Sequence, residues 1–128
     1  MLWKEELSVG IPEIDSDHRE LADCVTEIEV AVSRKQGGLS VHDAIAKLIS
    51  AAATHFDIEE SLMGMQGYPE IDDHIAGHGM FLQLLQRIEA MALVEPLSLT
   101  SIAFLQRWLE EHFEVDDRDY AAYVSSRD

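Results

Sequence analysis

Histidine and carboxylate side chains recur at one-turn spacing along this chain. His55 precedes Glu59 by four residues, and His74 precedes His78 by four. Residues four apart on an α-helix project from the same face about one turn apart, so each pair can reach one metal ion or two neighbouring ions. Imidazole nitrogens and carboxylate oxygens are common ligands of transition metals. These spacings predict a metal site built on helices.

The histidines also interrupt otherwise regular apolar stripes. A single histidine on an apolar face is more often a hydrogen-bonded core residue than a ligand. Burying an unpaired polar group costs about 1–3 kcal/mol, and a domain has a net stability of about 5–15 kcal/mol, so a buried cluster needs something that satisfies it. His42 lies one position beside its stripe and is expected on the solvated surface. The five inward histidines are His18, His55, His74, His78 and His112.

The apolar residues alternate between spacings of three and four, which is typical of long amphipathic helices. Four helices are predicted after an irregular arm over residues 1–14: from 15–17 to about 36, from a Ser40 cap to about 66, from Pro69 to about 93, and from a Ser98 cap onward. Gly67 is expected to end the second helix. The stripes are Leu21, Val25, Ile28 and Val32; Val41, Ile45, Leu48, Ala52, His55, Glu59 and Leu62; Ile71, His74, His78, Phe81, Leu85 and Ile88; and Ile102, Leu105, Leu109, His112 and Val115.

Long helices with short connections predict an all-α protein, an antiparallel up-down-up-down four-helix bundle. With 128 residues, the chain is expected to form one domain, 1–128, of which 15–128 is the bundle.

Composition excludes several classes of partner and compartment. The formal net charge of −16 opposes binding to nucleic acid or to an anionic membrane surface, and it favours a monomer. No secretory signal pattern and no uninterrupted apolar run of membrane-spanning length occurs. Cys24 is the only cysteine and is interpreted as a small buried filler. A cytoplasmic location is expected.

The second carboxylate of the site is ambiguous from helical periodicity. His112 is followed by Asp116 and Asp117. A residue four positions on is rotated by about 40° beyond a full turn, and one five positions on by about 140°. Regular geometry therefore favours Asp116, and Asp117 requires a local irregularity in the helix.

Counting donor atoms indicates the kind of metal. Five imidazoles and two carboxylates are too many ligands for one ion. If both carboxylates bridge two octahedral ions and one further oxygen bridges them, a single coordination position stays open for a small ligand. Zinc, which prefers four ligands, fits this count poorly, whereas iron or manganese fits it well.

The sequence resembles the bacterial hemerythrins over almost its whole length, and five histidines with two carboxylates at these separations are a specific pattern. The resemblance implies two iron ions joined by an oxo or hydroxo bridge. The matching residues are Trp3, Val9, Gly10, Ile14, Asp15, Asp17, His18, His55, Phe56, Glu59, Glu60, Met63, Tyr68, Pro69, His74, His78, Phe81, Trp108, Leu109, His112, Asp117 and Tyr120.

The resemblance also assigns the ligands. It implies that one iron, with no open position, is held by His74, His78 and His112, that the second, with an open position, is held by His18 and His55, and that Glu59 and Asp117 bridge the two. It thus selects Asp117 over Asp116, and a widened turn in the last helix would reconcile this choice with periodicity. The acids that flank the stripes are expected on solvated faces, with one of them available as a partner of a ligating histidine: Asp57, Glu60, Asp72 and Asp73.

The function implied by the resemblance is reversible O2 binding, for transport, storage or delivery, with sensing as a variant. The alternative is a di-iron redox enzyme, that is, an oxidase, peroxidase or nitric oxide reductase. The stripes carry no spare acid or base, so no catalytic residue is predicted and an enzyme is not expected. Apolar residues within a turn of the ligands, such as Leu21, Leu62, Leu105, Leu109 and Trp108, are expected to keep the O2 pocket dry.

Overall fold

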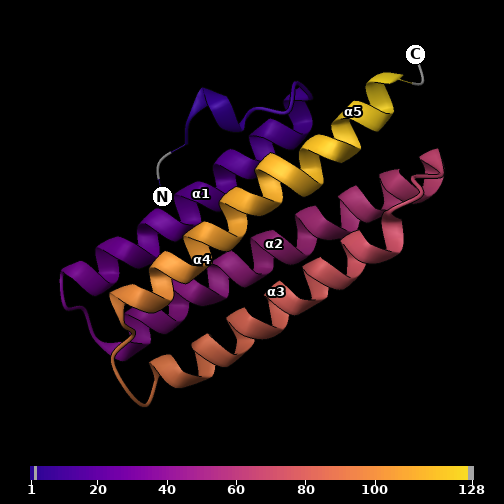
Figure 1. Ribbon diagram of the computed structural model, residues 1–128. Helices are drawn as coiled ribbons and strands as arrows, with labels where there is room; N and C mark the ends of the chain where they lie inside the picture. Colours follow the sequence, from indigo (N-terminus) through magenta and orange to yellow (C-terminus); the bar gives the residue numbers. More distant parts are fainter. Residues whose placement is uncertain (2, 127–128) are drawn as a thin grey trace.

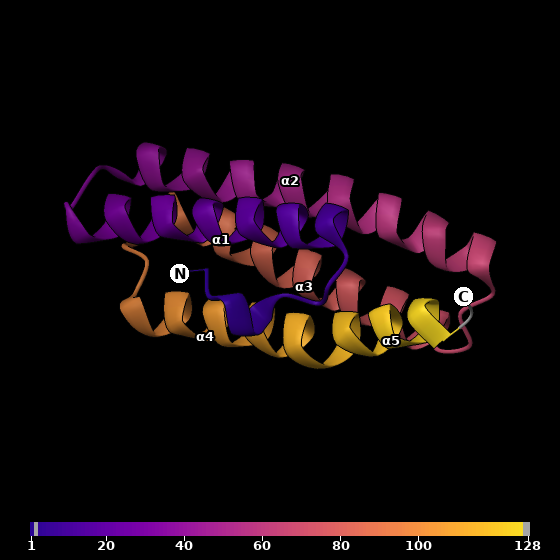
Figure 2. The ribbon, with the colours of Figure 1, turned by 90° about the horizontal axis from the view of Figure 1, so that it is seen from above.

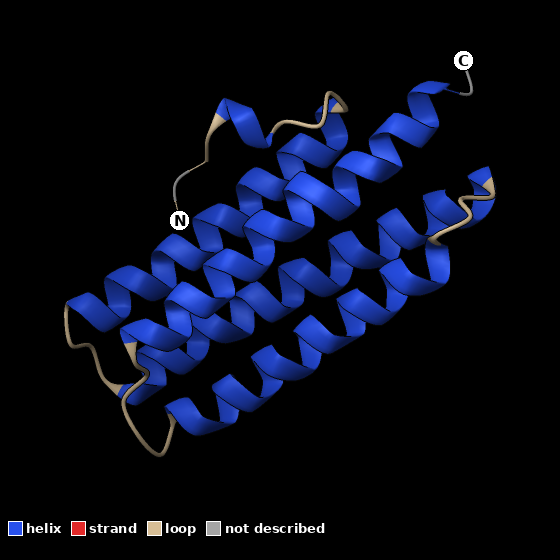
Figure 3. Cartoon of the chain, viewed as in Figure 1, coloured by secondary structure: helices blue, strands red, loops and turns tan. Residues whose placement is uncertain are grey.

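The computed structural model describes residues 1 and 3–126, and within them all regular structure is helical (Figures 1 and 3). The elements form four long rods, which run alternately up and down in Figure 1, and this confirms the all-α four-helix bundle. The last rod has three consecutive parts, one of them a π-helix. The elements are η1 (Glu5–Leu7), α1 (Pro12–Ser33), α2 (Gly38–Gln66), α3 (Ile71–Ala92), α4 (Leu99–Glu111), the π-helix η2 (His112–Asp117) and α5 (Arg118–Ser126).

Two of the predicted helix ends are confirmed, and their side chains or backbone angles explain them. Gly67 ends α2 with a φ of 65°, in the left-handed region that glycine adopts without strain. Ser98 caps α4, because its side-chain oxygen accepts a hydrogen bond from the backbone N–H of Ser101 at 3.1 Å.

Other predicted ends were wrong by a few residues. Helix α1 begins at Pro12, whose fixed φ suits a first turn, and ends at Ser33 rather than near residue 36. Helix α2 begins at Gly38, so Ser40 lies inside the helix and does not cap it. Helix α3 begins at Ile71, and Pro69 stands in the turn before it.

Most stripe residues are buried in the bundle interior, Val32, His55 and Ile71 are half-buried, and the last residues of two stripes, Leu62 and Val115, are exposed. Leu62 is 37% exposed, whereas Met63, the next residue, is fully buried. Val115 is 55% exposed, whereas Phe113, two residues earlier, is fully buried. Residues spaced alternately three and four apart rotate by about 20° per heptad around a straight helix. Three heptads after Val41, the position that faces the interior is therefore that of Met63 and no longer that of Leu62. The π-helix changes the phase of the last rod and turns Val115 outward.

Hydrogen bonds to two helices, α1 and α5, hold the N-terminal arm in place. Figure 2 shows it lying between α1 and the rod formed by α4 and α5. Arg118 donates hydrogen bonds to the backbone oxygens of Glu6 and Ser8. At the start of α1, the Asp15 carboxylate accepts bonds from the Ser8 hydroxyl at 2.6 Å and from the Val9 N–H at 2.9 Å.

Within residues 1 and 3–126, no helix is both long enough and apolar enough to cross a bilayer.

The close approach of α2 to the end of α3 gives a stability prediction. A Cβ at Gly38 would lie 2.7 Å from the backbone oxygen of Ala92, whereas a Cβ at Gly79 would meet nothing within 4 Å. Gly38→Ala is therefore expected to lower the free energy of unfolding by about 1–3 kcal/mol. Gly79→Ala, inside α3, should raise it by about 0.5–1 kcal/mol. Urea unfolding of both metal-free variants checks this, and equal effects would contradict the packing described.

Candidate metal centre

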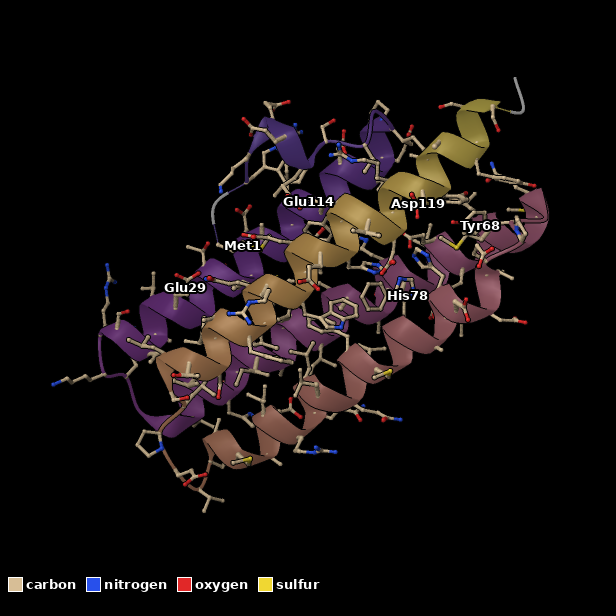
Figure 4. All side chains as sticks on the ribbon, in the orientation of Figure 1. Met1, Glu29, Tyr68, His78, Glu114 and Asp119 are labelled. Carbon is tan, nitrogen blue, oxygen red and sulfur yellow. The ribbon has the colours of Figure 1, made fainter. Side chains whose placement is uncertain are left out.

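Five buried ionisable side chains converge inside the bundle. Each offers a nitrogen or oxygen atom that lies within 4.8 Å of the corresponding atom of the others. In Figure 4 the labelled His78 lies among ring and carboxylate side chains in the interior. Helices α2, α3 and the π-helix supply the residues: Glu59, His74, His78, His112 and Asp117.

The two carboxylates of this cluster each contact more than one imidazole. Asp117 Oδ1 lies 2.9 Å from His74 Nε2 and 3.2 Å from His112 Nε2. Glu59 Oε1 lies 2.7 Å from His74 Nε2 and 3.3 Å from His78 Nε2. Each carboxylate is thus shared between two imidazoles.

The π-helix brings Asp117 into the cluster. Its hydrogen bonds join residues five apart, so Asp117 comes round to the face of His112. Asp116, which regular periodicity favoured, lies outside instead. Its carboxylate accepts a bond from His112 Nδ1 at 2.9 Å, and its side chain is 54% exposed. The widened turn expected from the resemblance is present, and it explains why simple periodicity selected the wrong neighbour.

His18 reaches the cluster through Asp117. Its Nε2 lies 2.7 Å from Asp117 Oδ2, and its ring stacks on Phe113 with centroids 3.8 Å apart. The structure therefore connects His18 on α1 with the carboxylate that the other helices share.

His55 lies at the border and faces a different set of acids. Its Nε2 is 3.0 Å from Glu20 Oε2, and its Nδ1 is 3.0 Å from Asp17 Oδ1, both on α1. Burial raises the pKa of Asp17, against the opposing effect of His55 and His18. The structure does not place His55 among the five converging residues, although its side chain is only 15% exposed.

His42 is remote from this cluster, as the sequence predicted, but it was wrongly expected to be solvated. Its side chain is 26% exposed, with Nε2 3.9 Å from a Glu89 oxygen on α3. A position beside the stripe near a helix start still packs against the neighbouring helix.

The cluster shifts the protonation of its members. Burial opposes charge on His74, but its hydrogen bonds with Asp117 and Glu59 prevail and raise its pKa to about 9. Burial also opposes charge on His112, yet the negative charge of Asp117 and the bond with Asp116 raise its pKa to about 10. The carboxyl of Asp117 is desolvated too, but the neighbouring histidines hold its pKa well below the usual range.

The donor set fits a metal. His78 Nε2 and His112 Nε2 face each other at 3.0 Å, and two such nitrogens can share only one proton. Asp117 Oδ1 is buried without an aligned hydrogen bond. Converging nitrogen lone pairs and carboxylate oxygens of this kind are satisfied together by a cation.

Glu60 contacts the cluster, although it was expected on a solvated face. The sequence indicated only that one of the acids beside the stripes could be the partner of a ligating histidine. The Glu60 side chain is 24% exposed, and Oε2 accepts a hydrogen bond from His78 Nδ1 at 2.7 Å. Its position directly after Glu59 could have indicated this contact. Neighbouring residues of a helix point about 100° apart, so Glu59 and Glu60 can face different sides of the same site. Phe113 was also missed, since nothing in the pattern fixed the phase of the π-helix.

Comparison with known proteins agrees with this geometry. Residues 9–124 match the family described as "Hemerythrin HHE cation binding domain". The chain is 30% identical to a bacteriohemerythrin of Stenotrophomonas maltophilia, over 98% of this chain and 82% of that protein. It is 27% identical to a bacteriohemerythrin of Pseudomonas aeruginosa, over 97% and 81%, and 25% identical to a myohemerythrin of Riftia pachyptila, over 93% and 89%. With a cluster of metal-binding side chains at the centre of its bundle, the chain belongs to the hemerythrin family.

Proposed function

We propose that this protein binds O2 reversibly at a di-iron centre, as a carrier or store rather than as an enzyme. The observation that carries the proposal is the buried convergence of three imidazole nitrogens with two shared carboxylates. The names of the relatives, bacteriohemerythrin and myohemerythrin, support the same function. The residues proposed to hold the two irons are His18, His55, Glu59, His74, His78, His112 and Asp117.

The proposed ligands divide between two ions. His74, His78 and His112 would hold one iron, and His18 and His55 the other, with Glu59 and Asp117 shared. Because His55 Nε2 is bonded to Glu20, iron would compete with Glu20 for that nitrogen. The exposed Glu20 side chain can turn to solvent at little cost.

A di-iron centre held by these residues would supply the electrons for O2 binding and would recover them on release. The surrounding residues keep water away. Leu21, Leu109 and Phe113 are all at most 1% exposed, and each lies within four residues of a proposed ligand. A dry pocket protects a reversible site, because access of protons to reduced oxygen would make the reaction irreversible.

The types of the buried polar side chains favour O2 binding over catalysis. Apart from Asp15, every buried polar or charged residue among those described belongs to the proposed ligand set. Asp15 is occupied in holding the arm, since it accepts hydrogen bonds from Ser8 and Val9. No buried carboxylate or imidazole among the described residues is therefore left over for general acid–base chemistry at the centre.

One observation favours the redox alternative. Asp17 is partly exposed, its pKa is raised, mainly by burial, and its carboxyl lies 3.0 Å from the ring of His55. A carboxyl at this position could relay protons to oxygen at the iron that His55 would hold, which is what an oxidase or peroxidase requires.

The proposal predicts different behaviour for two histidine variants. His55→Ala removes a ligand of the proposed O2-binding iron, so iron content should fall from two per chain towards one and O2 binding should be lost. His42→Ala, remote from the cluster, should keep both irons and bind one O2 per iron pair. Iron analysis and O2 titration of the reduced proteins check this. Loss of O2 binding in His42→Ala, or full binding in His55→Ala, would refute the ligand assignment.

A further inference from the structure

We propose that Glu60 is a positioning residue that holds the His78 imidazole in the orientation and tautomer needed to bind iron, and that its charge lowers the reduction potential of the centre. The inference rests on the proposed function and concerns a residue outside the ligand set. Glu60 lies on α2, directly after Glu59, and bonds to a histidine of α3.

The two ring nitrogens of His78 have separate tasks. Nδ1 lies 2.7 Å from Glu60 Oε2, and Nε2 points into the cluster, 3.3 Å from Glu59 Oε1 and 3.0 Å from His112 Nε2. An ionised carboxylate only accepts hydrogen bonds, so Nδ1 must carry a proton. The lone pair of Nε2 is then free for a metal, which is the tautomer a ligand requires.

Packing fixes the plane of the His78 ring. Phe56 stacks on it with centroids 3.8 Å apart and planes only 2° from parallel. Turning the ring over by half a turn would keep this stacking but would place a carbon opposite Glu60. The hydrogen bond to Glu60 therefore distinguishes two orientations that Phe56 alone does not.

The charge of Glu60 acts on the metal through the ring. A carboxylate bonded to Nδ1–H makes the imidazole a stronger donor at Nε2. Stronger donation favours ferric over ferrous iron and so lowers the midpoint potential. Asp116 makes the same kind of bond to His112 at 2.9 Å, but its side chain is 54% exposed against 24% for Glu60. Solvent screens the more exposed charge, so Glu60 is expected to have the larger effect.

Three variants of the full chain separate orientation from charge. Glu60→Gln keeps an acceptor oxygen but removes the charge, Glu60→Ala removes both, and Asp57→Asn removes an exposed charge on the same helix as a control. After iron loading, two quantities are measured: the midpoint potential by anaerobic titration and the rate of iron release to a chelator. Circular dichroism of the metal-free variants verifies that they fold.

The expected pattern is specific to the contact with His78. Glu60→Gln should load two irons and release them at the wild-type rate, but with a raised midpoint potential. Glu60→Ala should show a raised potential and release iron about 10–100-fold faster. Asp57→Asn should match the wild type in both measurements.

Two outcomes would overturn the inference while leaving the proposed function intact. One is a potential in Glu60→Gln no higher than in Asp57→Asn, and the other is a wild-type release rate in Glu60→Ala. If the wild-type protein itself took up no iron, the proposed function would fail and this inference with it.

Discussion

Replacing Asp117 with alanine is expected to reduce the iron content from two per chain to less than one. Asp117 is 1% exposed and lies within 3.2 Å of ring nitrogens of His18, His74 and His112. As the proposed bridge it contributes a bond to each iron, so its loss weakens both at once. In the metal-free protein the same change leaves buried imidazoles without a counter-charge, which costs about 3–5 kcal/mol.

The matched control is the neighbouring residue. Asp116→Ala removes an acid one position away whose carboxylate lies outside the cluster, on His112 Nδ1. It should keep two irons at saturation. Asp117→Asn preserves the shape of the side chain, so it tests the loss of the charge even if Asp117→Ala does not fold. It should also lose the iron pair. Iron analysis after loading decides the matter: equal iron content in the Asp116 and Asp117 variants would contradict the role given to the π-helix.

Raising the pH from 7 to 9.5 is expected to destabilise the metal-free protein, on the order of 5 kcal/mol from His74 and His112 together, since each unit of pKa difference corresponds to about 1.4 kcal/mol. The pKa values of these histidines in the folded protein are about 9 and about 10, above the ordinary value of 6.5. Over this pH range the folded state therefore binds more protons than the unfolded state. The contribution is complete below pH 6.5 and is lost as the pH rises through the folded-state values.

Iron loading supplies the control for this prediction. An imidazole whose Nε2 binds iron does not titrate in the same range, so the iron-loaded protein should lose much less stability between pH 7 and 9.5. The pKa of the Tyr68 hydroxyl and that of the Cys24 thiol are raised by burial, and their titration is common to both forms. Chemical denaturation at a series of pH values measures the difference. A stability of the metal-free protein that is constant or rises with pH would contradict the protonation of the cluster.

The fold was largely predictable because its signal is repetitive. Regular spacings of three and four set the helices, and Gly67 and Ser98 mark ends that depend on local chemistry alone. Start points at Pro12 and Gly38 were missed, since an N-terminus without a side-chain cap gives only a weak local signal. The drift of α2 that buries Met63 instead of Leu62 follows from helix geometry and could have been predicted from it.

The site was predictable as a set of residues but not as an arrangement. The positions of His74 and His78 follow from helical spacing, and the structure brings both to Glu59. Asp117 does not follow from spacing, because a π-helix depends on which packing the whole bundle prefers. The orientation of His55 towards Glu20 is also a tertiary effect, because the acids that its ring nitrogens face, Glu20 and Asp17, lie on another helix, α1.

Repeated oxygenation of the reduced, iron-loaded protein is the most direct test of reversible O2 binding. The protein is reduced without air, exposed to O2 and then deoxygenated under argon, while the visible charge-transfer absorption is followed. The proposed function predicts a band that appears with O2 and disappears on its removal, cycle after cycle, with no hydrogen peroxide in solution. A stable ferric spectrum after one exposure, with release of hydrogen peroxide, would contradict it and would support the redox alternative.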